Sequence, residues 1–177
     1  PRRAPARPFV LTVARVDPRK NHRAVLRAFE ALVAEGRDLE WIIAGPRGWR
    51  SEEVEAAIGR SPAGARIHWR TAVSELELAE LYAGAALFVW PSYAEGYGLP
   101  PLEAMRAGVP VIASNRTSLP EVLGAGALAI DPEDDAGLLE GCRLLLDDPV
   151  ASAALVACGM ARAAELSWAR TASETRA

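Results

Sequence analysis

The sequence predicts an α/β fold: a Rossmann-like three-layer domain in which a mainly parallel sheet is flanked by helices. Apolar, strand-like runs alternate along the chain with helical segments of about ten residues or more, which is the pattern of parallel strands joined by right-handed crossovers. The run at 85–90 (AALFVW) is continuously apolar, as in a strand buried on both faces. The 177 residues fit one domain, long enough to bury roughly two-thirds of its unfolded surface.

The first half of the chain contains three of the expected strands. Residues 1–8 lack periodicity and are rich in proline and arginine, so we expect a linker or hinge there and one domain over 9–177. Asn21 is a candidate N-cap, and Ser74 with Glu77 forms a capping-box pattern. The expected elements are a strand at 9–14, a helix at 21–35, a strand at 39–44, a helix at 51–59, a strand at 66–69 and a helix at 74–82.

The second half continues the alternation. Pro100 can begin a helix, because proline at a first helical position loses no hydrogen bond and presets φ. The acidic run at 133–135 suits a solvated helix N-terminus. The expected elements are a strand at 85–90, a helix at 100–107, a strand at 109–113, a short helix at 119–123, a strand at 127–130, and helices at 134–146 and 150–166.

Composition excludes several classes of function. The net charge of −3 gives no indication of a nucleic-acid partner. No apolar run approaches the roughly 18 residues that cross a bilayer, and no signal peptide opens the chain, so we expect a cytoplasmic protein without a transmembrane segment. The two histidines and two cysteines lack metal-ligand spacing, so we expect no metal site. We expect Cys142 and Cys158 to be buried thiols rather than a disulfide.

The segment from Pro91 to Met105 carries most of the functional information. It places two glycines, Gly96 and Gly98, between a buried strand and a new helix. Backbone N–H groups and the helix dipole converge at such a turn and favour an anion. The flanking Glu95 and Glu103 would repel phosphate, but they suit hydroxyl groups of a sugar or ribose. The alternative is an ordinary glycine turn with two solvated acids.

Basic residues follow the first strand and reach the same edge of the predicted sheet. Arg15 and Lys20 come directly after strand 9–14, and Lys20 is the single lysine among twenty basic residues. Ligands of parallel sheets bind beyond the carboxyl ends of the strands. A diphosphate held by Arg15, Lys20 and the amides of Gly98 and Leu99 fits this edge. The alternative interpretation is that Arg15 is an ordinary surface arginine and that the single lysine at position 20 is a chance of composition.

Six segments spread over nearly the whole chain carry a family resemblance. They are VARVDPRKN at 13–21, SELELAELY at 74–82, PSYAEGYGLPPLEAM at 91–105, GVPVIASN at 108–115, SLPEV at 118–122 and SW at 167–168. With them the sequence resembles the C-terminal, donor-binding domain of retaining glycosyltransferases of family 4 (glycosyl transferases group 1), which have the GT-B fold. Glu95 and Glu103 match the family's pair of glutamates separated by seven residues.

The resemblance implies a role for each matching position. Arg15 and Lys20 look like the pair that neutralises the diphosphate, and Glu95 looks like the glutamate that holds donor-sugar hydroxyls near the anomeric carbon. Glu103 matches the glutamate that accepts from the ribose. The implied catalytic residues are Glu95, Arg15 and Lys20. The implied substrate-binding residues are Gly96, Tyr97, Gly98, Leu99, Glu103, Ala72 and Val73.

Two positions depart from the family pattern. The loop 69–73 matches the place where the nucleotide base rests on backbone groups, but Thr71 stands where the family usually has glycine. The alternative interpretation is that this loop is only a turn that leads into the capping residue Ser74. Tyr97 stands where phenylalanine is common.

The resemblance further implies transfer of a sugar from a nucleoside diphosphate sugar to an acceptor hydroxyl, with retention and without a divalent metal or other cofactor. It implies a separate N-terminal acceptor-binding domain, which this chain does not contain, and hence an isolated domain that binds the donor weakly and does not transfer. Peripheral membrane association of the full-length enzyme is compatible with it. The segments lean toward mannosyltransferases and thus GDP-mannose.

Rival functions remain at this point. One is another sugar-nucleotide enzyme of the same architecture, an epimerase or a glycogen synthase. Another is a non-catalytic nucleotide-binding module, against which the presence of Arg15, Lys20, Glu95 and Glu103 together argues. A covalent nucleophile role for Glu95 is disfavoured, because no second carboxylate is identifiable as its general acid. An NAD-binding enzyme is weaker still, since no G-x-G-x-x-G follows the first strand.

Overall fold

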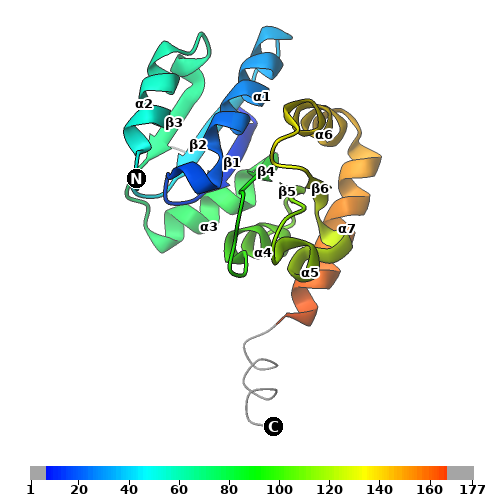
Figure 1. The fold of residues 1–177 in the computed structure, drawn as a ribbon. Helices are drawn as coiled ribbons and strands as arrows, with labels where there is room; N and C mark the ends of the chain where they lie inside the picture. Colours follow the sequence, from blue (N-terminus) through cyan, green and yellow to red (C-terminus); the bar gives the residue numbers. More distant parts are fainter. Residues whose placement is uncertain (1–6, 167–177) are drawn as a thin grey trace.

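The structure, a computed structural model, describes residues 7–166. Most of the expected linker at 1–8 and the matching Ser167 and Trp168 therefore lie outside the described residues. Six strands form one sheet (Figure 1). The strands are β1 Phe9–Val13, β2 Glu40–Ala44, β3 Ile67–Arg70, β4 Leu87–Trp90, β5 Val111–Ser114 and β6 Leu128–Ile130.

Helices connect the strands, and every expected helix is present in the described residues within a few residues of its predicted bounds. The α-helices are α1 His22–Ala34, α2 Ser51–Arg60, α3 Glu75–Gly84, α4 Leu99–Arg106, α5 Leu119–Leu123, α6 Asp135–Asp147 and α7 Pro149–Glu165, and the 3-10 turns are η1 Pro18–Lys20, η2 Gly64–Arg66 and η3 Gly124–Gly126.

The strand order is β3-β2-β1-β4-β5-β6, and all neighbouring pairs are parallel. The chain builds outward from β1 to β3 and then crosses to β4 on the other side of β1. Leu11 in β1 therefore lies opposite both Ile42 and Phe88. This reversal between β1 and β4 is the topological switch point, where an open α/β sheet offers a crevice for ligands. The predicted fold class is confirmed.

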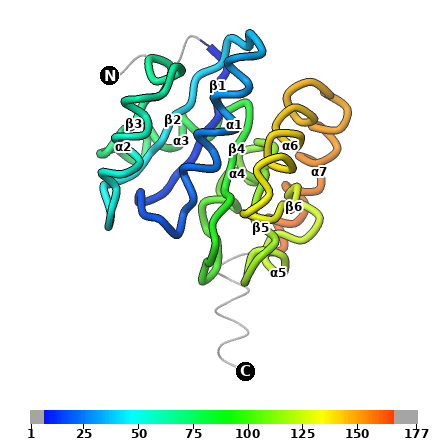
Figure 2. The backbone as a smooth tube through the Cα atoms, turned by 45° about the horizontal axis from the view of Figure 1, so that its top comes forward, coloured from blue at the N-terminus to red at the C-terminus, as the bar shows by residue number. Residues whose placement is uncertain are grey.

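Two hydrophobic clusters cover the two faces of the sheet. Strand residues alternate between them, because successive side chains of a strand point to opposite faces. One cluster joins the strands to α1, α2 and α6, and it includes Phe29, Trp41 and Leu138. The other joins them to α3, α4, α5 and α7, and it includes Phe88 and Met105. The three layers are visible in Figure 1, and the path of the chain through them can be followed in Figure 2.

The helix caps confirm one prediction and correct another. Ser74 Oγ accepts from the Glu77 amide, while the Glu77 carboxylate accepts from the Ser74 amide, so the capping box is present. Asn21 does occupy the N-cap position of α1, but its side chain does not cap that helix. Its φ is 55°, and its Nδ2 donates instead to the Pro132 carbonyl, 2.8 Å away. Asn21 thus ties the start of α1 to the loop before α6.

The expectation that both cysteines are buried is correct for one of them. Cys142 is buried in α6 as expected, but Cys158 is exposed on α7, and both thiols are free. The acidic run at 133–135 is exposed at the start of α6, so the expected solvated helix N-terminus is confirmed. Asp134 caps α6 by accepting from the Gly137 amide, while Glu133 and Asp135 form ion pairs with arginines from other segments.

No one helix within residues 7–166 has both the length and the apolar character needed to cross a membrane. Taken together, α6 and α7 reach that length and composition, but they are bent by 100° where they meet.

Candidate functional site

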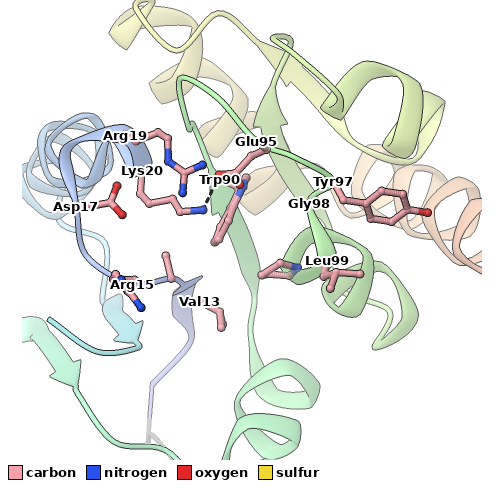
Figure 3. A pocket seen from close by; sticks show the side chains of 12 residues that line it. Val13, Arg15, Asp17, Arg19, Lys20, Trp90, Glu95, Tyr97, Gly98 and Leu99 are labelled. Atoms are coloured by element: carbon pink, nitrogen blue, oxygen red, sulfur yellow. Dashed lines mark hydrogen bonds and ion pairs between the residues drawn. The ribbon is translucent and has the colours of Figure 1, made fainter. Parts of the chain in front are cut away.

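A cleft of about 410 Å³ opens at the switch point of the sheet. Its walls come from the segment 13–20, which follows β1, and from the segment 90–100, which runs from the end of β4 into α4 (Figure 3). Both segments leave the carboxyl ends of neighbouring parallel strands, so they emerge at one edge of the sheet. The predicted meeting of these two segments is confirmed.

Six of the predicted site residues line this cleft. Arg15 and Lys20 come from the β1 side, and four residues face them from the β4–α4 side. The four are Glu95, Tyr97, Gly98 and Leu99. Figure 3 shows the two basic side chains on one wall and these residues on the other. With Arg19 and Asp17, which also line it, the cleft therefore brings three cations, two carboxylates and a helix N-terminus together.

Lys20 and Glu95 form the most enclosed ion pair of the cleft. Lys20 Nζ lies 2.7 Å from Glu95 Oε1, and the two side chains are only 11% and 8% exposed. The ammonium also lies over the ring of Trp90, 4.6 Å from its centroid. An ammonium on an aromatic face is attracted by the ring quadrupole, and this attraction grows as water is excluded. Two interactions thus fix the single lysine at the floor of the cleft.

One backbone and one side-chain hydrogen bond hold the two loops together beside this pair. The Tyr93 amide donates to the Arg19 carbonyl (2.8 Å), and Arg19 Nη1 donates to the Ala94 carbonyl (3.1 Å). Because Arg19 precedes Lys20 and Ala94 precedes Glu95, these bonds hold the ion pair's two backbones at a fixed separation. Arg19 was not singled out from the sequence, although it lies within the 13–21 motif.

The loop after β5 fixes Glu95 from the other side. The Glu95 amide donates to Thr117 Oγ1 (3.0 Å), and Ser118 Oγ donates to the Glu95 carbonyl (3.1 Å). Thr117 has a φ of 57°, a conformation that non-glycine residues adopt rarely. Both backbone groups of Glu95 are therefore held by hydroxyls, and only its side chain is left to interact with the cleft.

The start of α4 depends on Gly98. Its φ is +94°, and a β-carbon there would lie 2.5 Å from Leu119 Cδ2. Leu99 is the first helical residue, and Pro100 and Pro101 carry no N–H. The amides at the N-terminus of α4 that can serve an anion are therefore those of Gly98 and Leu99, as predicted from the sequence.

Arg15 is exposed and forms no ion pair within residues 7–166. Its side chain lies against Gly48, where an added β-carbon would come within 2.7 Å of Arg15 Cγ. The turn after β2 thus leaves room for the arginine at the cleft. An arginine without a carboxylate partner keeps all its donors for a ligand, and it fits phosphate oxygens in a bidentate manner.

Two polar atoms of the cleft residues are buried and lack a partner in the described chain. They are Asp17 Oδ1 and Trp90 Nε1. Trp90 belongs to the apolar run at 85–90, and its ring stacks on Phe88 with centroids 5.8 Å apart. It is both a core residue and part of the cleft floor. Asp17 carried no recognisable signal beyond its place in the 13–21 motif.

Four predicted residues lie outside the set that lines this cleft. Gly96 is exposed at the loop tip. Glu103 is exposed one turn into α4, where its Oε2 accepts from the Tyr82 hydroxyl (2.7 Å). Burial and this hydrogen bond raise the pKa of Tyr82. Ala72 and Val73 follow β3, two strands away from β1 at the same edge of the sheet.

The part of the chain that the structure describes contains no cluster of side chains suited to bind a metal ion. No group of three or more His, Cys, Asp or Glu side chains between residues 7 and 166 is arranged to hold a metal ion. The basic side chains that line the cleft are Arg15, Arg19 and Lys20.

Comparison with known proteins gives a consistent result. A family model described as glycosyl transferases group 1 matches residues 2–159. The O-antigen chain mannosyltransferase B of Escherichia coli is 40% identical over 169 residues, which cover 94% of this chain and 44% of that protein. The MMP alpha-(1->4)-mannosyltransferase of Mycolicibacterium hassiacum is 35% identical over 183 residues, which cover 99% of this chain and 43% of that protein.

A solved structure agrees in fold. The sucrose-phosphate synthase of Thermosynechococcus elongatus superposes with a TM-score of 0.85 at 27% identity, over 96% of this chain and 44% of that one. The chain thus spans less than half the length of these three proteins.

Proposed function

This chain belongs to the glycosyl transferases group 1 family, and we propose that it is the donor-binding domain of a glycosyltransferase. In this proposal the full-length enzyme moves a sugar from a nucleoside diphosphate sugar to an acceptor hydroxyl with retention of configuration. The observation that carries the proposal is the cleft at the switch point, where Arg15 and Lys20 face Glu95 and the N-terminus of α4.

The diphosphate would lie between the basic wall and the start of α4. Arg15 offers a guanidinium without an internal partner, and Lys20 offers the remaining hydrogens of its ammonium. The amides of Gly98 and Leu99 add the positive end of a helix dipole. As the bond to the anomeric carbon breaks, the departing diphosphate gains negative charge, and these preorganised donors stabilise it.

Glu95 would bind the sugar rather than attack it. Its carboxylate accepts a hydrogen bond from Lys20 and has further lone pairs for sugar hydroxyls. The Lys20 ammonium also neutralises the carboxylate, which lowers its strength as a nucleophile. Isolation of a covalent glycosyl-Glu95 species after reaction with donor would contradict this assignment.

The ribose and base would extend from the diphosphate along α4 and toward the β3 edge of the sheet. Glu103 is exposed on α4 and suits ribose hydroxyls, although Tyr82 already donates to one of its oxygens. Ala72 and Val73 follow β3 at the same edge and would offer backbone groups to the base. We expect that the enzyme needs no divalent metal, because side chains and amides supply the positive charge. Sugar transfer by the full-length enzyme should then continue unchanged when a chelator is added.

The sugar is proposed to be mannose, and GDP-mannose the donor. The support is the similarity to two proteins named as mannosyltransferases. Because the chain spans less than half of their lengths, acceptor binding is assigned to a separate N-terminal domain of the longer protein. Retention would be read from the anomeric configuration of the product that this longer protein forms.

A titration of the 177-residue chain tests the proposal. We expect GDP-mannose to bind more tightly than UDP- or ADP-sugars in calorimetry, and R15A to weaken it roughly tenfold or more, since hydrogen bonds to charged groups contribute about 1.5–3 kcal/mol. The matched control is R60A, which removes an exposed arginine from the end of α2, away from the cleft. Failure to bind any sugar nucleotide, or equal binding by R15A and the parent, would overturn the donor site.

A further inference from the structure

A second cavity, of about 240 Å³, lies beside the cleft and shares Asp17 with it. Its lining comes from the first turns of α1 and α2 and from Tyr93. The floor is buried, whereas Arg23, Arg50 and Tyr93 on the rim are exposed. Nothing in the proposed donor site uses this cavity.

His22 forms the floor of the second cavity and is only 1% exposed. Neither of its ring nitrogens has a hydrogen-bond partner within the described chain. Burial, assisted by the positive charge of Lys20, lowers the pKa of His22 to about 4. The ring is therefore neutral at pH 7, with one nitrogen that donates and one that accepts. A buried polar group without a partner is unfavourable, so both nitrogens call for a ligand or water in the cavity.

Asp17 and the rim define which ligands the cavity suits. Asp17 Oδ1 is buried and unpartnered, and a carboxylate oxygen only accepts hydrogen bonds. On the rim, Arg50 Nε donates to Glu53 Oε1 (2.6 Å), and Arg23 Nη1 lies 3.9 Å from Glu53 Oε2. Together with Asp17, the two arginines and Glu53 give the cavity a balanced formal charge, with both donors and acceptors.

The unpaired groups exclude a simple ion. An anion would use the imidazole donor but would face Asp17 and the accepting ring nitrogen. A cation would face two arginines and the imidazole N–H, and no three metal-ligating side chains cluster anywhere in residues 7–166. Hydroxyl groups both donate and accept, so they match the hydrogen-bonding character of Asp17 Oδ1 and of both unpartnered nitrogens of His22.

We propose that this second cavity is a carbohydrate subsite that binds one neutral sugar residue through its hydroxyls. Its volume is below the roughly 300–1,000 Å³ of pockets for drug-sized ligands, which suits a single ring. Tyr93, 39% exposed, lines the cavity with an aromatic residue of the kind that packs against the apolar side of a sugar. The shared Asp17 puts this ring next to the donor cleft. The sugar is either a residue of a glycan acceptor chain or a free monosaccharide.

The test uses methyl α-D-mannoside and a linear mannotriose as probes of the 177-residue chain, by saturation-transfer and protein-observed NMR. We expect both to perturb resonances of the first turns of α1 and α2. Mannotriose binding at least tenfold more tightly would identify a glycan chain as the occupant, and equal affinity a free monosaccharide. Each titration is repeated with saturating GDP. If GDP does not bind but the sugars do, the donor proposal fails while the subsite stands.

Two variants locate the binding. R50A removes a rim guanidinium, and R47A is its matched control: an exposed arginine of the same turn that also pairs with a glutamate of α2 but does not line the cavity. We expect at least a tenfold loss of sugar affinity in R50A and none in R47A. H22F removes both floor nitrogens and should abolish binding; a thermal melt verifies its fold. Absence of sugar binding, or undiminished binding in both R50A and a folded H22F, would overturn the subsite and leave water as the partner of these groups.

Discussion

Lys20 and Glu95 illustrate how two residues with separate roles depend on each other. Lys20 Nζ lies 2.7 Å from Glu95 Oε1, and both side chains have little access to water. A diphosphate that enters the cleft must compete with Glu95 for the ammonium, and a sugar hydroxyl must share Glu95 with the ammonium. Removing one partner of a buried pair leaves an uncompensated charge. The pair therefore couples the two ends of the proposed donor.

Glu95→Gln separates these two effects. Without the carboxylate, the Lys20 ammonium lacks its charge partner, so we expect GDP alone to bind roughly three- to tenfold more tightly. The sugar loses an acceptor, so the extra affinity of GDP-mannose over GDP should shrink. Calorimetric titration of both ligands against parent and variant measures this. Weaker GDP binding in the variant would show that Glu95 does not compete for Lys20.

His22 gives the chain a specific sensitivity to acid. Its pKa is about 4 in the folded chain, against an ordinary value of 6.5, because burial and the charge of Lys20 disfavour the imidazolium. The unfolded chain therefore binds the proton first. The contribution of neutral His22 is complete above pH 6.5 and is lost as the pH falls toward 4, by about 3 kcal/mol in total.

Denaturant unfolding at a series of pH values tests this dependence. The parent should lose free energy of unfolding steeply between pH 6.5 and 4, and His22→Gln should lose about 3 kcal/mol less over that range. Other carboxylates titrate in both proteins and cancel in the difference. Parallel pH curves for parent and variant would contradict a depressed pKa for His22.

The junction between β4 and α4 is the element that places the anion-binding amides. Its geometry rests on one glycine, because Gly98 combines a φ of +94° with a close approach to Leu119. Gly96, two residues earlier, has no atom within 4 Å of a β-carbon position. The two glycines of the motif thus differ in role: one is required by the backbone, and the other lies at an open loop tip.

Gly98→Ala and Gly96→Ala form a matched pair within this loop. We expect Gly98→Ala to lower the free energy of unfolding by about 1–3 kcal/mol, because the side chain strains φ and meets Leu119, and to weaken nucleotide binding. Gly96→Ala should stay within about 0.5 kcal/mol of the parent, as most surface substitutions do. Thermal or urea unfolding measures both. Equal effects of the two substitutions would refute the distinction.

The sheet as a whole is held at its centre by a buried polar link. Trp41 Nε1 in β2 donates to Thr12 Oγ1 in β1 (3.1 Å), and Thr12 Oγ1 lies 3.4 Å from the Val89 carbonyl in β4. The link spans three strands at the switch point, beneath the cleft. Because Thr12 and Trp41 are almost fully buried, water cannot replace either bond.

Thr12→Val tests the link, because it preserves shape and removes the hydroxyl. The Trp41 N–H would be buried without a partner, and we expect a loss of about 1–3 kcal/mol in the free energy of unfolding. Thr12→Ser keeps the hydroxyl and should retain the link, with only the smaller loss of a methyl group. Urea denaturation of the parent and both variants measures these differences in the free energy of unfolding. Thr12→Val as stable as the parent would mean that the link contributes nothing.

The order of helices and strands could be predicted from the sequence because the local signals of each element agree with the structure that it adopts. The capping box at Ser74, the apolar run at 85–90 and Pro100 each agree with the final structure. The sequence predicts Asn21 as an N-cap, but the distant Pro132 carbonyl accepts from its side-chain amide instead. The sequence also predicts that Cys158 is buried, but the alanine-rich sequence of α7 does not indicate which face is exposed, and Cys158 lies on the exposed face.

The sequence alone determined the α/β class, the order of elements and the edge at which Arg15, Lys20 and the Gly98 turn meet, since alternating periodicity and parallel strands fix these locally. Only the tertiary structure decided that Lys20 pairs with Glu95 over Trp90, and that Asp17 and His22 line a second cavity. Those relations join residues far apart in the chain. They depend on how loops pack against one another, which no local pattern specifies.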